Sequence, residues 1–203
     1  MNYLLVALFA YLLGSVSFAV IVSRVFGLPD PRTYGSNNPG ATNVLRTGNK
    51  LAAALTLIFD TLKGWLAVVI AVRAAPVLGL GNAAAALAGL SVFLGHLFPA
   101  FYQFKGGKGV ATALGVLLAL DWRIGCLAAL IWVALFALMR ISSIAALIAT
   151  TTTPLISYYF RGGDQVTLVI LIVALLVLWR HKENIRRLLV GREDKVGDKP
   201  NRL

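Results

Sequence analysis

Charged side chains are scarce in this sequence: only 13% of its 203 residues are Asp, Glu, Lys or Arg, whereas 59% are hydrophobic. Together with a mean hydropathy of +0.81, this scarcity excludes an ordinary soluble domain, because such a domain needs a polar surface to face water. The composition instead predicts an all-α, polytopic integral membrane protein, since helices satisfy their own backbone hydrogen bonds in lipid.

Acidic residues and cysteines are also few. Eight Asp and Glu stand against 19 Lys and Arg, which gives a formal net charge of +11. The cations flank apolar runs, so we attribute them to cytoplasmic loops and anionic lipid headgroups and expect no nucleic-acid partner. The single cysteine, Cys126, excludes an internal disulfide. No pattern of metal ligands is visible, and we expect neither a metal nor a cofactor.

The apolar residues form seven runs, which predict a bundle of about seven transmembrane helices in one integral membrane domain, residues 1–203. The first run lacks a basic segment before it and is interpreted as an uncleaved span. A five-span alternative would place Asp121 and Arg123, or Arg161 and Asp164, inside the membrane at roughly 2.5 to 3.5 kcal/mol per charge. The runs cover about residues 2–23, 51–73, 80–101, 109–120, 124–139, 141–160 and 165–179, the fourth being short.

Basic residues fall mostly on one side of this topology. The loops after the first, third and fifth runs share a face with the basic tail, residues 180–203, and this face holds most of the cations. Because Lys and Arg stay on the cytoplasmic side, we expect the N-terminus outside and the C-terminus in the cytoplasm. All the polar motifs described below lie on that cytoplasmic side.

A polar loop at residues 34–46 reads YGSNNPGATNVLR. Asn38 suits a helix N-cap, Pro39 the first helical position and Gly48 a stop, so we predict a short helix from about residue 39 to 47. Free N–H groups at its start would form an anion cradle. The cradle is assigned to Asn38, Gly40, Ala41, Thr42 and Asn43. A tight connector with Asn, Pro and Gly as simple turn formers explains the loop about equally well.

A second polar loop, FKGGKGVAT at residues 104–112, opens the fourth run. Gly106 and Gly107 allow close backbone approach, Lys105 and Lys108 supply charge, and the following helix start supplies oriented N–H donors. The spacing is not that of a Walker A motif, so nucleotide hydrolysis is not expected. A glycine-rich connector at the membrane boundary is the plain alternative. We favour phosphate binding because the first loop lies on the same side.

Polar residues near the spans give further candidates. Asp60 and Lys63 share a helix face deep in the second run, either as an internal ion pair or as charges lining a substrate pocket. His96 is expected to pack, because no acidic residue at helical spacing would orient it as a base. Ser142 and Ser143 would cap the sixth run or contact a headgroup, and capping is the safer interpretation.

The basic tail carries one more pair of candidate site residues. His181 and Asn184 lie three residues apart, so on a helix they share one face, next to an apolar stripe that suits the membrane surface. A stop-transfer tail that binds anionic lipid explains several of the arginines. It does not explain His181 and Asn184.

Five motifs in this order resemble the membrane-integral acyl-phosphate:glycerol-3-phosphate acyltransferase family of bacterial phospholipid synthesis. The resemblance covers nearly the whole chain. The motifs are G-S-x-N-x-G-A-T-N from Gly35 with Arg46, D-x-x-K-G from Asp60, G-H-x-x-P from Gly95, K-G-G-K-G-V-A-T from Lys105, and R-H-x-E-N from Arg180 with Gly191-Arg-Glu193.

The resemblance implies seven spans and transfer of an acyl group from acyl phosphate to the 1-hydroxyl of glycerol 3-phosphate, giving lysophosphatidic acid and phosphate. It assigns the catalytic or substrate-contacting roles to Ser36, Arg46, Lys108, His181 and Asn184. Gly106 and Gly107 would belong to the glycerol-phosphate site, and Glu193 to the integrity of the last motif. The first loop would hold acyl phosphate, while Ser36 orients the attacking hydroxyl or the carbonyl.

The same resemblance implies a bacterial inner (cell) membrane location with the active site on the cytoplasmic face. The expected partners are acyl phosphate, glycerol 3-phosphate, membrane lipid and the soluble enzyme that makes acyl phosphate from acyl carrier protein. Lys63, Lys105, Ser142 and Ser143 complete the predicted substrate contacts. A transporter of a phosphorylated solute remains the alternative from another class; it predicts flux without lysophosphatidic acid.

Overall fold

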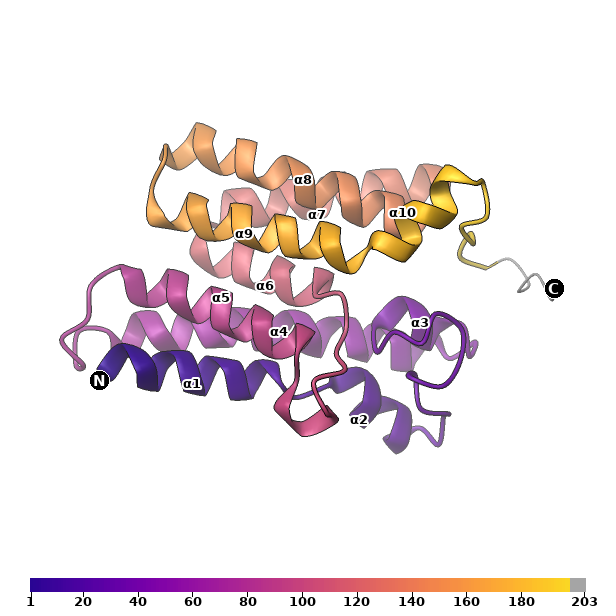
Figure 1. Ribbon diagram of the computed structural model, residues 1–203, viewed down its shortest axis with the longest axis horizontal. Helices are drawn as coiled ribbons and strands as arrows, with labels where there is room; N and C mark the ends of the chain where they lie inside the picture. The colour runs from indigo at the N-terminus through magenta and orange to yellow at the C-terminus, as the bar shows by residue number, and fades with distance from the viewer. Residues whose placement is uncertain (198–203) are drawn as a thin grey trace.

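The computed structural model describes residues 1–197, and every regular element among them is helical. The long helices run side by side, with the N-terminus at one end of the bundle and the last described residues at the other (Figure 1). The α-helices are α1 (Asn2–Gly14), α2 (Phe18–Val25), α3 (Ala41–Leu45), α4 (Lys50–Ala74), α5 (Ala83–Leu97), α6 (Val110–Leu120), α7 (Trp122–Met139), α8 (Ser142–Arg161), α9 (Gln165–Arg180) and α10 (Lys182–Leu189), with a 3-10 turn η1 (Ala100–Tyr102). Residues 198–203 of the predicted basic tail lie outside the described residues.

Four segments within residues 1–197 are long and apolar enough to cross a membrane: Asn2–Val25, Lys50–Ala74, Ala83–Tyr102 and Trp122–Met139. A fifth is added if α9 and α10, which meet at a bend of 58°, count as one span. The short fourth run is α6, a helix of 11 residues. The predicted all-helical, multi-pass membrane architecture is therefore confirmed.

The first apolar run is not one continuous helix. α1 ends at Gly14 and α2 begins at Phe18, because Ser17 has an extended backbone. At this break the Val16 carbonyl accepts a hydrogen bond of 2.7 Å from Lys63 Nζ, which also lies 2.7 Å from Asp60 Oδ1. Asp60 and Lys63 thus form the internal ion pair that the first of the two explanations predicts: the pair neutralises both charges inside the bundle and satisfies a carbonyl that the break leaves open.

Glycines allow the helices to approach closely. A Cβ atom at Gly115 of α6 would lie only 1.9 Å from the Thr61 carbonyl oxygen of α4, and one at Gly95 of α5 would lie 2.2 Å from the Tyr11 carbonyl oxygen of α1. No larger residue fits without separating the helices. Backbone contact of this kind is how helices pack in lipid, where hydrophobicity does not drive association.

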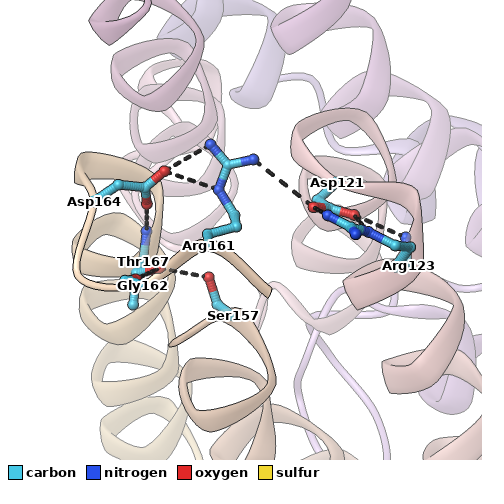
Figure 2. A network of polar contacts seen from close by, with 7 residues as sticks. All are labelled: Asp121, Arg123, Ser157, Arg161, Gly162, Asp164 and Thr167. Carbon is cyan, nitrogen blue, oxygen red and sulfur yellow. Dashed lines mark hydrogen bonds and ion pairs between the residues drawn. The ribbon is translucent and has the colours of Figure 1, made fainter. Parts of the chain in front are cut away.

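A polar network ties α7, α8 and α9 together where these helices begin or end (Figure 2). Arg161, at the end of α8, donates to Asp164 Oδ2 at 2.9 and 2.7 Å and lies 3.8 Å from Asp121 Oδ2. Asp164 accepts from the Thr167 amide and caps α9, while Asp121 accepts from the Arg123 amide and caps α7. The four charges that argued against the five-span alternative thus pair with one another where the helices end.

Two local predictions were wrong. The short helix α3 begins at Ala41 rather than Pro39, and its N-cap is Gly40, with an extended backbone, rather than Asn38. Ser142 and Ser143 do not cap α8, because its N-cap position is Ile141 and no side chain caps it. Gly48, predicted as the stop of this helix, lies three residues beyond its last residue, Leu45, and has a φ of +84° that favours glycine.

Candidate active site

The first polar loop, the glycine-rich loop and the last described residues meet around a cavity of about 440 Å³. One part is polar and lined by, among others, Ser36, Asn38, Arg46, Asp60, His96, Lys108, Ser142, Ser143, His181, Asn184, Arg187, Glu193 and Asp194. The other part is apolar and lies among α6, α7 and α8, where it is lined by Leu114, Leu117, Ala128, Ala129, Trp132, Val133, Ala146 and Ala149. The cavity can therefore hold a molecule that is charged at one end and apolar at the other.

Lys108 is held in this cavity by Asn184. Its Nζ donates to Asn184 Oδ1 at 2.5 Å, and Asn184 Nδ2 donates to Glu193 Oε1. Burial lowers the pKa of Lys108 to about 8, while the nearby Glu193 carboxylate acts in the opposite direction. The ammonium group is therefore charged at neutral pH and lies beside a carboxylate that keeps it so.

Glu193 organises this side of the cavity. Its carboxylate accepts from Ser143 Oγ at 2.8 Å and from Arg187 Nε at 2.6 Å, in addition to Asn184. These donors come from α8 and α10, so Glu193, which follows α10, links the two helices. The charge of Glu193 is thus fully engaged, and the residue fixes the amide plane of Asn184.

The first loop is fixed by Asn43, whose side chain is buried. Asn43 Oδ1 accepts from the Ser36 amide, and Asn43 Nδ2 donates to the carbonyls of Pro31 and Tyr34. Gly35 adopts a φ of +57° directly against the Asn43 side chain, which leaves no space for a Cβ atom. Asn43 therefore supports the loop from behind and presents Ser36 to the cavity.

The predicted backbone cradle is smaller than expected. The Gly40 amide donates to the Asn38 carbonyl, and the Asn43 amide donates to the Gly40 carbonyl. Ala41 and Thr42 hold the first two positions of α3, where an N–H has no partner within the helix. Two of the five predicted amides, those of Gly40 and Asn43, are thus engaged within the loop. The amides of Ala41 and Thr42 lie beside the Thr42 hydroxyl, which shares a hydrogen bond with Ser142 Oγ at 3.1 Å.

The glycine-rich loop is held by a residue whose role the sequence did not reveal. Arg180 donates to the Gly106 carbonyl at 2.6 Å and to the Gly107 carbonyl at 3.0 Å. In the sequence Arg180 is one of many tail cations, and only its place beside His181 in the last motif sets it apart. A smaller cavity of about 240 Å³ lies beside this contact; it shares Ser36, Asn38, Lys108, Asn184 and Arg187 with the larger one and adds Arg180 and Lys182.

His181 presents one nitrogen to the cavity. Its Nδ1 lies 2.8 Å from the Val177 carbonyl oxygen, and a carbonyl can only accept, so Nδ1 carries the proton. Burial lowers the pKa of His181 to about 4, so the ring is neutral at pH 7 and Nε2 has a free lone pair. His181 can therefore accept a hydrogen bond but is a weak base.

Four predicted contacts are not brought into the larger cavity. Lys63 is buried behind it and bound to Asp60 and Val16, as described above. Lys105 is exposed, whereas Gly106 and Gly107 are buried. None of the three lines this cavity, although Gly106 lines the smaller one. By contrast, Asp60 and His96 do line it, although His96 was expected only to pack. They come from α4 and α5, so spacing along one helix could not reveal their proximity.

Comparisons with known proteins agree with one another. A family model described as glycerol-3-phosphate acyltransferase matches residues 4–191. The chain is 56% identical over 188 residues to glycerol-3-phosphate acyltransferase of Nitrosospira multiformis, covering 93% of each chain, and 55% identical to that of Cupriavidus pinatubonensis, covering 97% of each.

Solved structures give the same result. The crystal structure of PlsY (YgiH), an integral membrane glycerol 3-phosphate acyltransferase, in its glycerol 3-phosphate form superposes with a TM-score of 0.88 at 38% identity, covering 97% of this chain and 96% of that one. Its lysophosphatidic acid form superposes with a TM-score of 0.86 at 36% identity, covering 96% and 95%.

Proposed function

Because this chain belongs to the glycerol-3-phosphate acyltransferase family, we propose that its cavity transfers a fatty acyl group from acyl phosphate to the 1-hydroxyl of glycerol 3-phosphate. The products are lysophosphatidic acid and phosphate. The chain is an integral membrane acyltransferase rather than a transporter, as its relatives and the two PlsY structures indicate. The acyl phosphate donor is the proposed part.

One observation carries the proposal: polar groups from three distant segments and an apolar space share one cavity. Ser36 and Arg46 come from the first loop, Lys108 from the second and Asn184 from α10, while the apolar part lies among α6, α7 and α8. An acyl chain in the apolar part would gain roughly 0.8 kcal/mol per buried CH₂. Both phosphorylated groups and the acyl chain of the donor can then be bound in one cavity.

The proposed roles follow from the contacts. Lys108, Arg46 and Asn184 bind the phosphate of glycerol 3-phosphate, and Arg46 is already oriented at the cavity by Asp194, 3.0 Å away. The amides of Ala41 and Thr42, with Ser142 nearby, bind the phosphate of the donor. Ser36 orients the attacking hydroxyl or the acyl carbonyl.

The chemistry needs little help from the protein because acyl phosphate is an activated mixed anhydride. The glycerol hydroxyl oxygen attacks the acyl carbon, the bond from that carbon to the phosphate oxygen breaks, and phosphate leaves. His181 Nε2 accepts a hydrogen bond from the hydroxyl and so orients it, but a ring with a pKa of about 4 does not retain the proton. The proton passes to the departing phosphate, and positioning and charge stabilisation supply the catalysis.

The proposal includes a topology. Seven spans, an external N-terminus and a cytoplasmic C-terminus with the basic tail, all in one domain of a bacterial inner membrane, would open the cavity to the cytoplasm. Glycerol 3-phosphate and the soluble enzyme that makes acyl phosphate would then reach the site from the cytoplasm. The distribution of Lys and Arg supports this orientation.

The test uses the purified protein in lipid, with glycerol 3-phosphate and either acyl phosphate or acyl coenzyme A. We expect lysophosphatidic acid from acyl phosphate alone. Transfer from the thioester alone would refute the proposed donor. Loss of product in Lys108→Met and Asn184→Ala, with the protein still folded, would support the site.

A further inference from the structure

A buried polar cluster lies directly behind the candidate active site. It consists of Asp60 and Lys63 on α4, His96 on α5 and Thr112 on α6, each less than a tenth exposed. Asp60 and His96 also line the cavity. Polar and charged groups inside a membrane bundle are unfavourable unless they are paired, and they frequently mark function. The roles proposed above use none of the four.

His96 is held on two sides by this cluster. Its Nδ1 lies 3.1 Å from Thr112 Oγ1 and 3.7 Å from Asp60 Oδ1. Asp60 is itself fixed by Lys63, which is anchored at the break between α1 and α2. Helices α4, α5 and α6 thus all determine where the imidazole ring lies.

The other edge of the ring lies where the two substrate-binding loops meet. A Cβ atom at Gly107 would lie 2.3 Å from His96 Nε2 and 3.0 Å from the Pro39 carbonyl oxygen. The Gly107 amide also donates to the His96 carbonyl at 3.2 Å. Gly107 is therefore enclosed between the ring and the first loop, and Lys108 is the next residue.

We propose that His96 is a positioning residue that sets the distance between the first loop, with Ser36, and the second loop, with Lys108. This inference rests on the proposed function, since it concerns how the two substrates of that reaction are placed against each other. Each loop has its own supports, Asn43 for the first and Arg180 for the second. The ring determines their relative placement.

This role predicts a specific kinetic result. Without the ring each loop still binds its substrate, but the hydroxyl and the acyl carbon no longer meet at the correct distance. A misplacement of about 1 Å reduces the rate by roughly 100-fold. We therefore expect kcat of His96→Ala and His96→Asn to fall roughly 10- to 100-fold, with both KM values within about threefold of the wild type.

A milder variant tests the same point if His96→Ala does not fold. Thr112→Val keeps the shape of the side chain but removes the hydroxyl that holds the ring, so we expect kcat to fall about fivefold, as for one hydrogen bond. The matched control is Thr56→Val on α4, a buried threonine whose hydroxyl donates to the Ala52 carbonyl of its own helix. It should keep the wild-type kcat. In the double variant His96→Ala with Thr112→Val the losses should not add.

The outcomes distinguish the alternatives. Wild-type kcat in both His96→Asn and Thr112→Val would overturn the proposal, and so would changes confined to KM. A loss beyond about 1,000-fold in His96→Asn without any effect of Thr112→Val would also overturn it, because the ring would then take part directly in the reaction. If the wild-type protein does not use acyl phosphate, the proposed donor fails, whereas the His96 comparison can still be made with whichever donor is active.

Discussion

At the scale of single residues, the clearest consequence of the structure concerns the charge of Lys108. Its pKa is lowered to about 8 by burial, so the ammonium group begins to lose its proton just above neutral pH. A neutral amine attracts phosphate far less than an ammonium ion does. We therefore expect kcat/KM for glycerol 3-phosphate to decrease above pH 7, with a midpoint near 8, because this ratio reports groups of the free enzyme.

The measurement is kcat/KM between about pH 7 and about pH 9.5, with Lys108→Arg as the comparison. Arginine stays charged throughout this range, so the variant should show no alkaline decrease even if its activity is low. An equally steep decrease in Lys108→Arg would assign the titration to another group.

Glu193 gives a second prediction at this scale. Its carboxylate accepts from Asn184, Ser143 and Arg187, so removing it leaves Asn184 without the group that orients its amide. We expect Glu193→Ala to lower kcat/KM by roughly 100-fold through misplacement of Asn184 and Lys108. Ser143→Ala removes one of the three donors and should lower it about fivefold. Equal effects of the two substitutions would contradict this ranking.

The site residues that the sequence could predict are those that belong to a short local motif. Ser36, Arg46, Lys108, His181 and Asn184 were proposed from loops and motifs, and all five line the cavity. The contacts of Asp60 with His96 and of Arg180 with the glycine-rich loop join residues far apart in sequence. No spacing rule within one helix detects such contacts, because they depend on which helix faces pack together.

At the scale of helices, close packing of α4 against α6 places the Lys108 loop. Gly115→Ala would bring a Cβ atom to 1.9 Å from the Thr61 carbonyl oxygen, so α6 must move away. Overpacking of this kind typically destabilises by about 1 to 3 kcal/mol. We expect a lower Tm in detergent and reduced activity. The control is Gly163→Ala, where the nearest atom would be 3.9 Å from the new Cβ, and its Tm should not change.

The network in Figure 2 lies at the end of the bundle opposite the cavity, and it predicts that two substitutions there lower stability by different amounts. Asp121 is buried and caps α7, so Asp121→Ala should lower stability by about 1 to 2 kcal/mol through loss of the cap. Arg161 is partly exposed, and pairs of that kind contribute about 0.2 to 1 kcal/mol, so Arg161→Gln should have a smaller effect. The melting temperatures of the two variants measure this difference. A larger effect of Arg161→Gln would mean that the ion pair, and not the cap, holds this end.

Sequence patterns predict some of the helix boundaries and miss others. The short fourth run was correctly placed, because Gly109 and Asp121 bound α6 on either side. The break at residues 15–17 was missed, since Ser15, Val16 and Ser17 carry no charge and form no strong turn signal. At this break the Val16 carbonyl is bound by Lys63, which belongs to another helix. Conversely, Pro154 lies inside α8 without ending that helix. Tertiary contacts decide both cases.

At the scale of the whole molecule, the two ends of the bundle differ in chemistry. One end carries the ion pairs of Asp121, Arg161 and Asp164. The other carries the cavity, which joins the first loop, the second loop and the residues around α10. Helices that alternate in direction bring these three segments to the same end, as Figure 1 shows. The convergence of the three segments is thus a property of the topology.

Cysteine labelling tests on which side of the membrane the cavity opens. In a Cys126→Ser background, which removes the native thiol, Val77→Cys and Arg192→Cys each place one exposed cysteine at opposite ends of the bundle. If the positive end faces the cytoplasm, a membrane-impermeant maleimide should label Val77→Cys, and not Arg192→Cys, in sealed right-side-out vesicles, with the reverse in inverted vesicles. Labelling of Arg192→Cys from outside would place the cavity on the external face, where soluble cytoplasmic substrates could not reach it, and would refute the proposed orientation while leaving the acyltransferase chemistry intact.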